Sequence, residues 1–379
     1  MRYYIIAGEA SGDLHGSNLI KELRKLDAAA TIRCWGGDKM EAAGATLVKH
    51  YRDLAFMGFV EVLKNLRTIF KNIDFCKKDI LAHRPDVLVL IDYPGFNLRI
   101  AKWAKQQGLT VIYYISPQVW AWKENRVKMM KQCIDKMLVI LPFEKDYFKN
   151  KWNWEVEYVG HPLVEVVDEF LHEDKKNIEQ GTRNIEQGSG NTIALLPGSR
   201  RQEILKKLPI MLEVAKHFPE YQFVVAKAPG LDENFYAELL KPYSNVSSVV
   251  NKTYALLVQS KAALVTSGTA TLETAYLNIP QVVCYRIEAG RLGTWVKDRL
   301  VKIPFFSLVN LIANREIVKE LFQQYCTPET VSKELNKILT DRTYRESMLT
   351  GYAEVLEELG GPGCAKRAAN EMIELLKAK

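Results

Sequence analysis

The sequence predicts an α/β protein made of two doubly wound, Rossmann-like domains that face a cleft. Short apolar strands alternate with helical segments from the third residue onward, which is typical of a parallel sheet covered by helices. The alternation runs twice, because a polar segment at residues 171–191 interrupts it. The chain has 379 residues, more than twice the ~150-residue modal domain, so each run is long enough for its own core.

The first run occupies residues 1–170. Its strands are short stretches rich in Val, Ile, Leu and Tyr, and they are bounded by turn residues such as Gly, Asp and Pro. We expect strands at Tyr3–Ala7, Thr31–Trp35, Val87–Ile91, Thr110–Ile115 and Met137–Leu141. Helical periodicity predicts helices at Leu14–Lys25, from Phe59 to about His83, at Phe96–Gln107 and at Glu124–Gln132.

The second run occupies residues 192–345. We expect its strands at Thr192–Leu196, Gln222–Ala226, Val246–Val250, Ala263–Val265 and Gln281–Tyr285. The polar segment before it contains NIEQGTR followed by NIEQGSG, which indicates a surface linker. Residues 346–379 are helical except for a break at 360–363, and we expect the closing helix to pack back on the first domain or on a partner.

The composition of the chain excludes several classes of function. The net charge of +7 fits attraction to anionic lipid or nucleotide phosphate but is too small to predict nucleic-acid binding. The six cysteines have no short spacing, so we expect buried thiols rather than a zinc site or disulfides. We find no signal peptide and no apolar run of ~18 residues, so we expect a cytoplasmic protein whose membrane contact is peripheral.

The stretch from Ala262 to Pro280 carries the clearest ligand signal. It predicts an apolar strand, a turn of Thr266, Ser267, Gly268 and Thr269, and a helix that stops at Pro280. Such a turn directs backbone N–H groups and hydroxyls at one spot, which suits the diphosphate of a sugar nucleotide. Glu273, one turn into the helix, would accept hydrogen bonds from sugar or ribose hydroxyls. The alternative is an ordinary strand-to-helix turn with hydroxyl caps.

Eight short motifs together resemble those of one known enzyme family. They are GEASGD at 8–13, FMGFVEVL at 56–63, IDYPGFN at 91–97, SPQVWAWKENR at 116–126, LPFEKDYF at 141–148, VGHPL at 159–163, LLPGSRRQEI at 195–204 and SGTATLE at 267–273. Together they resemble the lipid-A-disaccharide synthase family, and they cover nearly the whole chain in order. The resemblance implies the B-type glycosyltransferase arrangement, in which the cleft lies between the carboxyl ends of two sheets.

The resemblance also implies a reaction of the Gram-negative envelope pathway. An inverting, metal-independent transferase without a cofactor would join UDP-2,3-diacylglucosamine to 2,3-diacylglucosamine 1-phosphate through a β-1,6 bond and release UDP. The absence of a D-x-D pair fits this, since neutralising UDP then falls to Arg200 and the backbone of two loops. The expected UDP-binding residues are Arg200, Ser199, Gly198, Ser267, Gly268, Thr269, Thr271 and Glu273, with Asn310 and Glu316 added by resemblance.

Inversion needs a base that takes the proton of the attacking acceptor hydroxyl. Asp92 is our candidate, because it follows the apolar strand Val87–Ile91 and therefore lies at the carboxyl end of the first sheet. It could instead cap the helix near Phe96. Glu9, after the first strand, is a second catalytic candidate that would orient the acceptor or assist the base, or else is a solvated loop acid.

Apolar residues in the first domain are candidates for lipid contact. Gln118, Trp120 and Trp122 form an aromatic loop after a strand, which would line a sugar or acyl surface. The zone from Leu54 to Phe70, which includes Met57 and Phe59, is too apolar for one core-facing stripe. Lysines and arginines lie beside it, so we expect contact with acyl chains or the inner-membrane surface, unless the zone is simply a buried helix.

The remaining predictions concern the hinge, the oligomer and departures from the family. His161 would fix a hinge at the domain junction or, as the alternative, contact the ligand. The resemblance suggests a homodimer with exchanged C-terminal segments. Family members often have an acid at Gly95, and a Pro and a Gly at Val309 and Asn314, which puts the Asn310 loop in question.

Two other functions stay open. One is another UDP-N-acetylglucosamine enzyme of similar architecture, either a 2-epimerase or the transferase that makes lipid II. The other is a catalytically idle membrane-associated binding protein.

Overall fold

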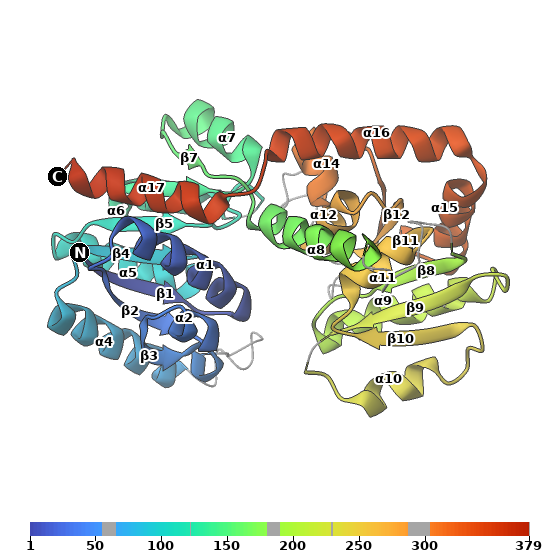
Figure 1. Cartoon of the computed structure of the whole chain (residues 1–379), viewed down its shortest axis with the longest axis horizontal. Helices are drawn as coiled ribbons and strands as arrows, with labels where there is room; N and C mark the ends of the chain where they lie inside the picture. Colours follow the sequence, from blue (N-terminus) through green and yellow to red (C-terminus); the bar gives the residue numbers. More distant parts are fainter. Residues whose placement is uncertain (55–65, 122, 180–189, 229, 287–303, 379) are drawn as a thin grey trace. The chain divides into compact units, whose positions relative to one another are not determined.

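The computed structural model describes residues 1–54, 66–121, 123–179, 190–228, 230–286 and 304–378. The chain forms two compact units, shown in Figure 1. Unit 1 comprises Met1–Pro162 and Gly361–Lys379, and unit 2 comprises Leu163–Gly360. Each unit contains a parallel sheet with helices between successive strands, which confirms the predicted α/β class.

Unit 1 has a seven-stranded parallel sheet in the order β3-β2-β1-β4-β5-β6-β7 within the described residues. Its strands are β1 (Arg2–Ala7), β2 (Thr31–Gly36), β3 (Thr46–His50), β4 (Val87–Ile91), β5 (Val111–Tyr114), β6 (Lys136–Val139) and β7 (Glu157–Tyr158). Its helices are α1 (Ala10–Leu26), α2 (Asp38–Ala42), η1 (Tyr51–Leu54), α4 (Leu66–His83), α5 (Pro94–Gln106), η2 (Glu124–Arg126), α6 (Val127–Cys133), α7 (Pro142–Trp152) and α17 (Cys364–Lys377).

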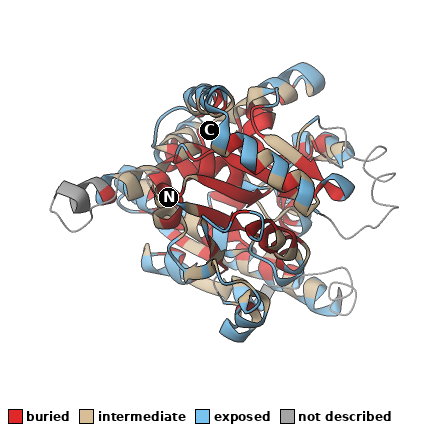
Figure 2. Ribbon diagram, turned by 90° about the vertical axis from the view of Figure 1, so that its right-hand side faces the viewer, coloured by how far each residue is buried: buried red, intermediate tan, exposed pale blue. Residues whose placement is uncertain are grey.

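The sheet of unit 1 is buried on both faces. Figure 2 colours buried residues red, and the strands in its centre are red while the outward sides of the helices are pale blue. Successive side chains of a strand point to opposite faces, so Tyr3 and Ile5 join one core cluster while Tyr4 and Ile6 join the other. The first cluster is covered by α1 and α17, and the second by α4, α5 and α6. Strands buried on both sides must be apolar throughout, which is why they could be recognised in the sequence.

Unit 2 has a six-stranded parallel sheet in the order β10-β9-β8-β11-β12-β13 within the described residues. Its strands are β8 (Thr192–Leu196), β9 (Gln222–Lys227), β10 (Val246–Val250), β11 (Ala262–Thr266), β12 (Gln281–Tyr285) and β13 (Lys319–Phe322). Its helices are α8 (Pro162–Glu179), α9 (Arg201–Ala215), α10 (Glu233–Leu240), α11 (Thr253–Gln259), α12 (Thr269–Tyr276), α14 (Leu308–Ala313), η3 (Gln323–Tyr325), α15 (Pro328–Thr340) and α16 (Arg342–Leu359).

The C-terminal helix α17 returns to unit 1, where it lies beside α1 (Figure 1). The Cys364 thiol donates a hydrogen bond to the carbonyl of Gly160 at 3.0 Å, and Arg367 Nε donates to the carbonyl of Val159 at 2.8 Å. Helix α17 is therefore fixed to the segment at which the chain leaves unit 1.

The unit boundaries differ from the predicted ones. The first domain was predicted to end at residue 170, but α8 belongs to unit 2 almost from its start. The returning segment was predicted to begin at residue 346, but α16 also belongs to unit 2, so the return begins at Gly361. A helix runs through residue 170 because Pro162 supplies a favourable first helical position. The tandem repeat falls almost entirely outside the described residues.

Candidate active site

The two predicted carboxylates of unit 1 follow neighbouring strands. Strand β1 pairs with β4 in parallel, with Ala7 opposite Ile91, so the residues after them emerge at one edge of the sheet. Glu9 follows β1 and Asp92 follows β4. The strand order reverses between β1 and β4, and a crevice at the carboxyl ends of such a pair is where open α/β sheets bind ligands.

The turn that carries Asp92 has an unusual backbone. Asp92 and Tyr93 both have positive φ angles, of 43° and 48°, which non-glycine residues rarely adopt. The Asp92 carbonyl accepts hydrogen bonds from Asn97 Nδ2 at 2.8 Å and from the Tyr113 hydroxyl at 2.5 Å. Asn97 is fully buried. These contacts hold a strained turn in place, and such strain occurs at ligand and active sites.

The Asp92 carboxyl group has properties of a general base. Burial, and then the negative charge of Glu9, raise its pKa from the ordinary value of 3.8 to about 6, while a hydrogen bond from the Tyr93 backbone opposes this. Asp92 does not cap the following helix, because α5 begins at Pro94 and its N-cap is Tyr93. Since a base works best when its pKa lies near the operating pH, the geometry favours the catalytic alternative.

Two other residues of the GEASGD motif have structural roles. The ring of Tyr93 lies against Gly8, where an added Cβ would come within 2.3 Å of it, so Gly8 allows the β1 and β4 loops to meet. The buried carboxylate of Asp13 accepts hydrogen bonds from the backbone N–H groups of Gly37 and Met40 at 2.7 and 3.0 Å. It therefore caps the start of α2 from a distance.

The aromatic loop after β5 is partly structural. Gln118 is exposed, and Trp120 is half-buried with its ring edge-to-face on Phe143. The indole Nε1 of Trp120 donates a hydrogen bond to Glu144 Oε1 at 3.2 Å. Only the part of the Trp120 ring that does not pack on Phe143 could contact a sugar. Trp122 lies outside the described residues.

Glu144 is a functional candidate that we did not predict. It is buried at the third position of α7, where its other oxygen accepts from the Leu141 N–H at 3.0 Å. Burial raises the pKa of this carboxyl to about 7, against the lowering effect of its hydrogen bonds. The LPFE sequence contained a signal, because an acid three residues after an N-cap can bond back to the cap.

His161 lies at the boundary between the units, since unit 1 ends at Pro162. It is buried, and burial with the nearby His15 lowers its pKa to about 3, so the ring is neutral. Gly160 before it has a φ of 88°, which an L side chain rarely adopts. The hinge role of His161 stays a prediction.

In unit 2 the two predicted donor loops also meet at a point where the strand order reverses. Strands β8 and β11 pair with Leu196 opposite Val265, so the loop of Gly198 and the turn after Thr266 emerge side by side. A Cβ added at Gly198 would lie 3.6 Å from the Thr266 methyl group. The backbone of both loops is therefore close enough to contact one diphosphate.

The turn before α12 is open toward its N-terminal end. Gly268 is the N-cap, its φ of 126° favours glycine, and an added Cβ would find no atom within 4 Å. Thr269 is exposed at the first helical position. The hydroxyl groups of Ser267 and Thr271 donate to the carbonyls of Phe306 and Gly268, both at 2.8 Å. These two hydroxyls thus shape the turn, and the backbone N–H groups at the N-terminus of α12 are the groups that suit an anion there.

Glu273 and Arg200 flank this turn. Glu273 is half-buried, burial raises its pKa, and one of its oxygens accepts a hydrogen bond from the Tyr254 hydroxyl at 2.9 Å. Arg200 is exposed at the N-cap of α9, and its Nη1 lies 3.8 Å from Glu203 Oε1. Gly198 has a φ of 115°, and an added Cβ would lie 2.7 Å from the Glu203 carboxylate. Arg200 is thus a solvent-facing cation in the loop that adjoins the turn.

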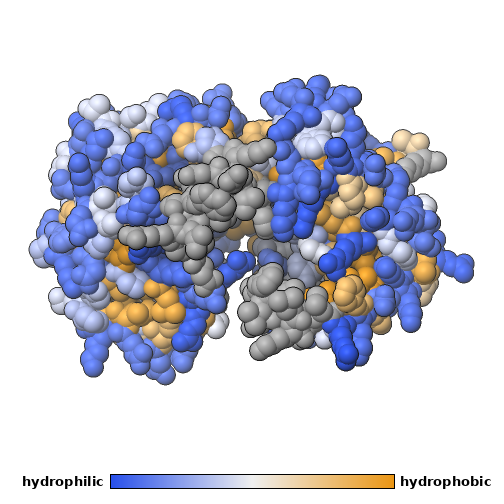
Figure 3. Space-filling model, turned by 180° about the vertical axis from the view of Figure 1, so that it is seen from behind, coloured by the Kyte–Doolittle hydropathy of each residue, from blue (hydrophilic) through white to orange (hydrophobic). Residues whose placement is uncertain are grey.

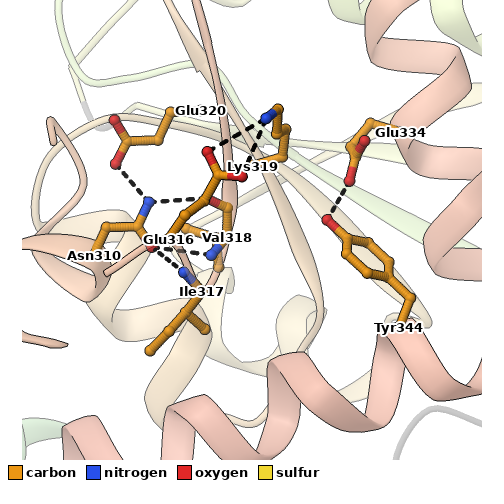
Figure 4. A network of polar contacts seen from close by, with 8 residues as sticks. All are labelled: Asn310, Glu316, Ile317, Val318, Lys319, Glu320, Glu334 and Tyr344. Atoms are coloured by element: carbon orange, nitrogen blue, oxygen red, sulfur yellow. Dashed lines mark hydrogen bonds and ion pairs between the residues drawn. The ribbon is translucent and has the colours of Figure 1, made fainter. Parts of the chain in front are cut away.

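Asn310 lies in a closed network, drawn in Figure 4. Its Oδ1 accepts from the backbone N–H groups of Ile317 and Val318, and its Nδ2 donates to the Val318 carbonyl and to Glu320. The amide is fully buried, so it stabilises the entry to β13. Glu316 is exposed and forms an ion pair with Lys319 at 3.1 Å. A direct contact of either side chain with UDP stays a prediction that these contacts do not favour.

The three positions at which the sequence departs from the family pattern fit the local structure. Asn314 is the C-cap of α14 with a φ of 50°, and Asn tolerates this left-handed conformation better than most residues other than glycine. Val309 is fully buried inside the same helix. Gly95 is exposed, with no atom within 4 Å of an added Cβ.

Several predictions concern features of the described part of the chain as a whole. No group of three or more His, Cys, Asp or Glu side chains there is arranged to hold a metal ion. All six cysteines are buried and none forms a disulfide. Among these residues no helix combines the length and apolar character needed to cross a bilayer. Met57 and Phe59 lie outside the described residues.

Comparisons with known proteins give a consistent result. A family model described as Lipid-A-disaccharide synthetase matches residues 3–370. The lipid-A-disaccharide synthase of Geobacter metallireducens is 38% identical over 383 aligned residues, which cover 100% of this chain and 98% of the relative. That of Myxococcus xanthus is also 38% identical, with 99% and 97% covered.

Solved structures share the fold at low identity. The UDP-GlcNAc 2-epimerase from Neisseria meningitidis bound to UDP-GlcNAc gives a TM-score of 0.68 at 15% identity, with 100% of both chains covered. The glycotransferase of kitacinnamycin gives 0.66 at 16% identity, with 99% and 98% covered. These likenesses show the two-domain fold that glycosyltransferases and epimerases share.

Proposed function

The chain belongs to the lipid-A-disaccharide synthase family and is a glycosyltransferase, and we propose that it joins UDP-2,3-diacylglucosamine to 2,3-diacylglucosamine 1-phosphate with inversion. The products are the β-1,6-linked disaccharide 1-phosphate and UDP. The observation that carries the proposal is that the candidate residues of each unit follow the two strands at which the strand order reverses. Glu9 and Asp92 occupy this position in unit 1, and Arg200 and the turn at 266–269 occupy it in unit 2.

Asp92 is proposed as the general base. Its carboxylate takes the proton of the acceptor 6-hydroxyl as that oxygen attacks the anomeric carbon of the donor. A pKa of about 6 leaves Asp92 largely ionised at neutral pH, while making it a stronger base than an ordinary aspartate. The neighbouring charge of Glu9 contributes to this pKa, which supports Glu9 as an assisting residue.

Unit 2 is proposed to bind the UDP group and stabilise its departure. As the bond between the anomeric carbon and the diphosphate oxygen breaks, negative charge develops on the diphosphate. The N-terminus of α12 offers backbone N–H groups, the loop of Gly198 and Ser199 offers others, and Arg200 adds a charge-assisted hydrogen bond. Glu273 is placed on the second turn of α12, where its unshared oxygen can accept from a ribose or sugar hydroxyl.

We also propose peripheral binding to the inner-membrane surface. Phe70, Phe75 and Leu81 are exposed on α4, and Phe70 keeps 54% of its surface accessible. Arg67, Lys71 and Lys78 are exposed on the same helical face, opposite the buried Ile73, Cys76 and Ile80. An outward face that combines large apolar side chains with cations suits an anionic lipid surface. Hydrophobic side chains also form patches within a mainly hydrophilic surface on the face seen in Figure 3.

The test is a reconstitution with defined lipids. The purified protein is incubated with both monosaccharide lipids, and UDP release and disaccharide formation are measured, with each lipid alone as the control. Disaccharide formation only with both lipids is expected. Epimerisation of UDP-N-acetylglucosamine, or UDP release without disaccharide, would contradict the proposal and favour a related sugar-nucleotide activity. The proposed homodimer with exchanged C-terminal segments is tested separately, by measuring molecular mass in solution.

A further inference from the structure

A buried lysine lies beneath the candidate donor turn and has no role in the function described so far. Lys207 is on the second turn of α9, on the side that faces the sheet, and only 3% of its surface is exposed. Its ammonium group donates a hydrogen bond to the hydroxyl of Thr266. Thr266 is the last residue of β11 and directly precedes the turn of Ser267 and Gly268.

Among the described residues, the Lys207 ammonium is surrounded by an aromatic ring, two thiols and one hydroxyl acceptor. Its Nζ lies 5.8 Å from the centre of the Tyr285 ring, and the thiols of Cys284 and Cys326 are close enough to influence its charge. An ammonium has three donors, and Thr266 accepts one of them. Burial lowers the pKa of Lys207, which reflects the unfavourable desolvation of this charge.

The acid that interacts with Lys207 is Glu203, one helical turn earlier. The same carboxylate lies 3.8 Å from Arg200 Nη1 and borders Gly198. Glu203 therefore interacts electrostatically with two cations, the buried Lys207 and the exposed Arg200. Because Lys207 helps to balance the charge of Glu203, Arg200 is held less strongly by that carboxylate and can turn to an anionic ligand.

We propose that Lys207 is a positioning residue of the donor site, whose buried charge balances Glu203 beneath the turn and favours binding of the UDP diphosphate. The inference rests on the proposed function of this turn. A cation excluded from water is screened little by salt, so it acts on a phosphate even without touching it. Its hydrogen bond to Thr266 also fixes the residue from which the turn begins.

The test compares two ligands and three variants by calorimetry. Lys207→Gln keeps a hydrogen-bond donor and removes the charge, whereas Lys207→Met removes both. Lys216→Met is the control, because Lys216 lies at the far end of α9 and is exposed. UDP carries the diphosphate, and uridine lacks it, so the pair separates an effect of charge from a loss of structure.

We expect both Lys207 variants to bind UDP about tenfold more weakly, because a unit charge roughly 12 Å from the diphosphate has an effect of this order at an effective dielectric of about 20. Uridine affinity should change by less than about twofold in every protein, and Lys216→Met should match the wild type. Thermal melting checks that the variants are folded. Unchanged UDP affinity in Lys207→Gln would overturn the inference, as would an equal loss for UDP and uridine. A wild-type protein that does not bind UDP would instead overturn the proposed function, and this inference with it.

Discussion

Replacing Asp92 with Asn should lower turnover at least about a hundredfold and stabilise the protein, and both effects come from one carboxyl group. The pKa of Asp92 is raised from 3.8 to about 6, a difference of about two units, and each unit corresponds to 1.36 kcal/mol. Ionising this carboxyl therefore costs the folded state up to about 3 kcal/mol above pH 6. Asn keeps the shape and the acceptor for the Tyr93 N–H but has no charge to bury.

The pH dependence gives the sign of the stability effect. Between about pH 4 and pH 6 the folded protein keeps the proton on Asp92 while the unfolded chain has lost it, so the wild type loses stability as the pH rises. The stability gain in Asp92→Asn should be near zero below pH 4, grow through this window and level off above pH 6. At its upper limit the gain corresponds to roughly 6–12 °C in the melting temperature.

The assay pairs melting curves from pH 4 to pH 8 with disaccharide turnover. Loss of a general base lowers kcat by about 10²–10⁴-fold, and UDP affinity should be nearly unchanged. Glu9→Gln is the matched control carboxylate. Retained turnover in Asp92→Asn with loss in Glu9→Gln would reverse the two roles. A melting difference that does not vary with pH would refute the buried-charge argument.

Three further predictions concern the donor, metal ions and lipid. Arg200→Ala should weaken UDP binding by about 1.5–3 kcal/mol, the range for a lost hydrogen bond to a charged group, and unchanged affinity in calorimetry would remove Arg200 from the site. Activity should survive EDTA, since in the proposed reaction Arg200 and the N-terminus of α12 neutralise the departing diphosphate, and a loss that magnesium restores would contradict this. Changing Arg67, Lys71 and Lys78 to Glu should abolish co-sedimentation with anionic vesicles at low salt, whereas binding equal to the wild type would exclude the outward face of α4 as the lipid contact.

The sequence predicted the central strands well and only one of the four edge strands. Val87–Ile91 and Thr192–Leu196 agree with the structure at both ends, because strands covered on both faces must be continuously apolar. Three edge strands, β3, β7 and β13, were not predicted and are only partly buried, whereas the edge strand β10 was predicted at Val246–Val250. An edge strand such as Lys319–Phe322 can carry polar residues, so its composition resembles that of a loop.

The site could be predicted where it depends on position along a strand, and not where it depends on packing. Asp92 was predicted because the end of a parallel strand places a residue at the ligand-binding edge. The local sequence indicates the capping position of Glu144, but the burial of Glu144 and Lys207 comes from segments distant in sequence. Asn310 illustrates the converse, since a residue expected to bind nucleotide has its amide occupied by its own chain.

The return of α17 to unit 1 determines the order in which the protein can fold during synthesis. Cys364, Ala368 and Met372 belong to the same core cluster as Tyr3 and Ile5, although the whole of unit 2 separates them in the chain. Unit 2 is complete once Gly360 has left the ribosome, whereas unit 1 must wait for the last residues to be translated. Unit 1 is therefore begun first and completed last. A premature stop at codon 361 would leave unit 2 whole and expose the apolar face of α1.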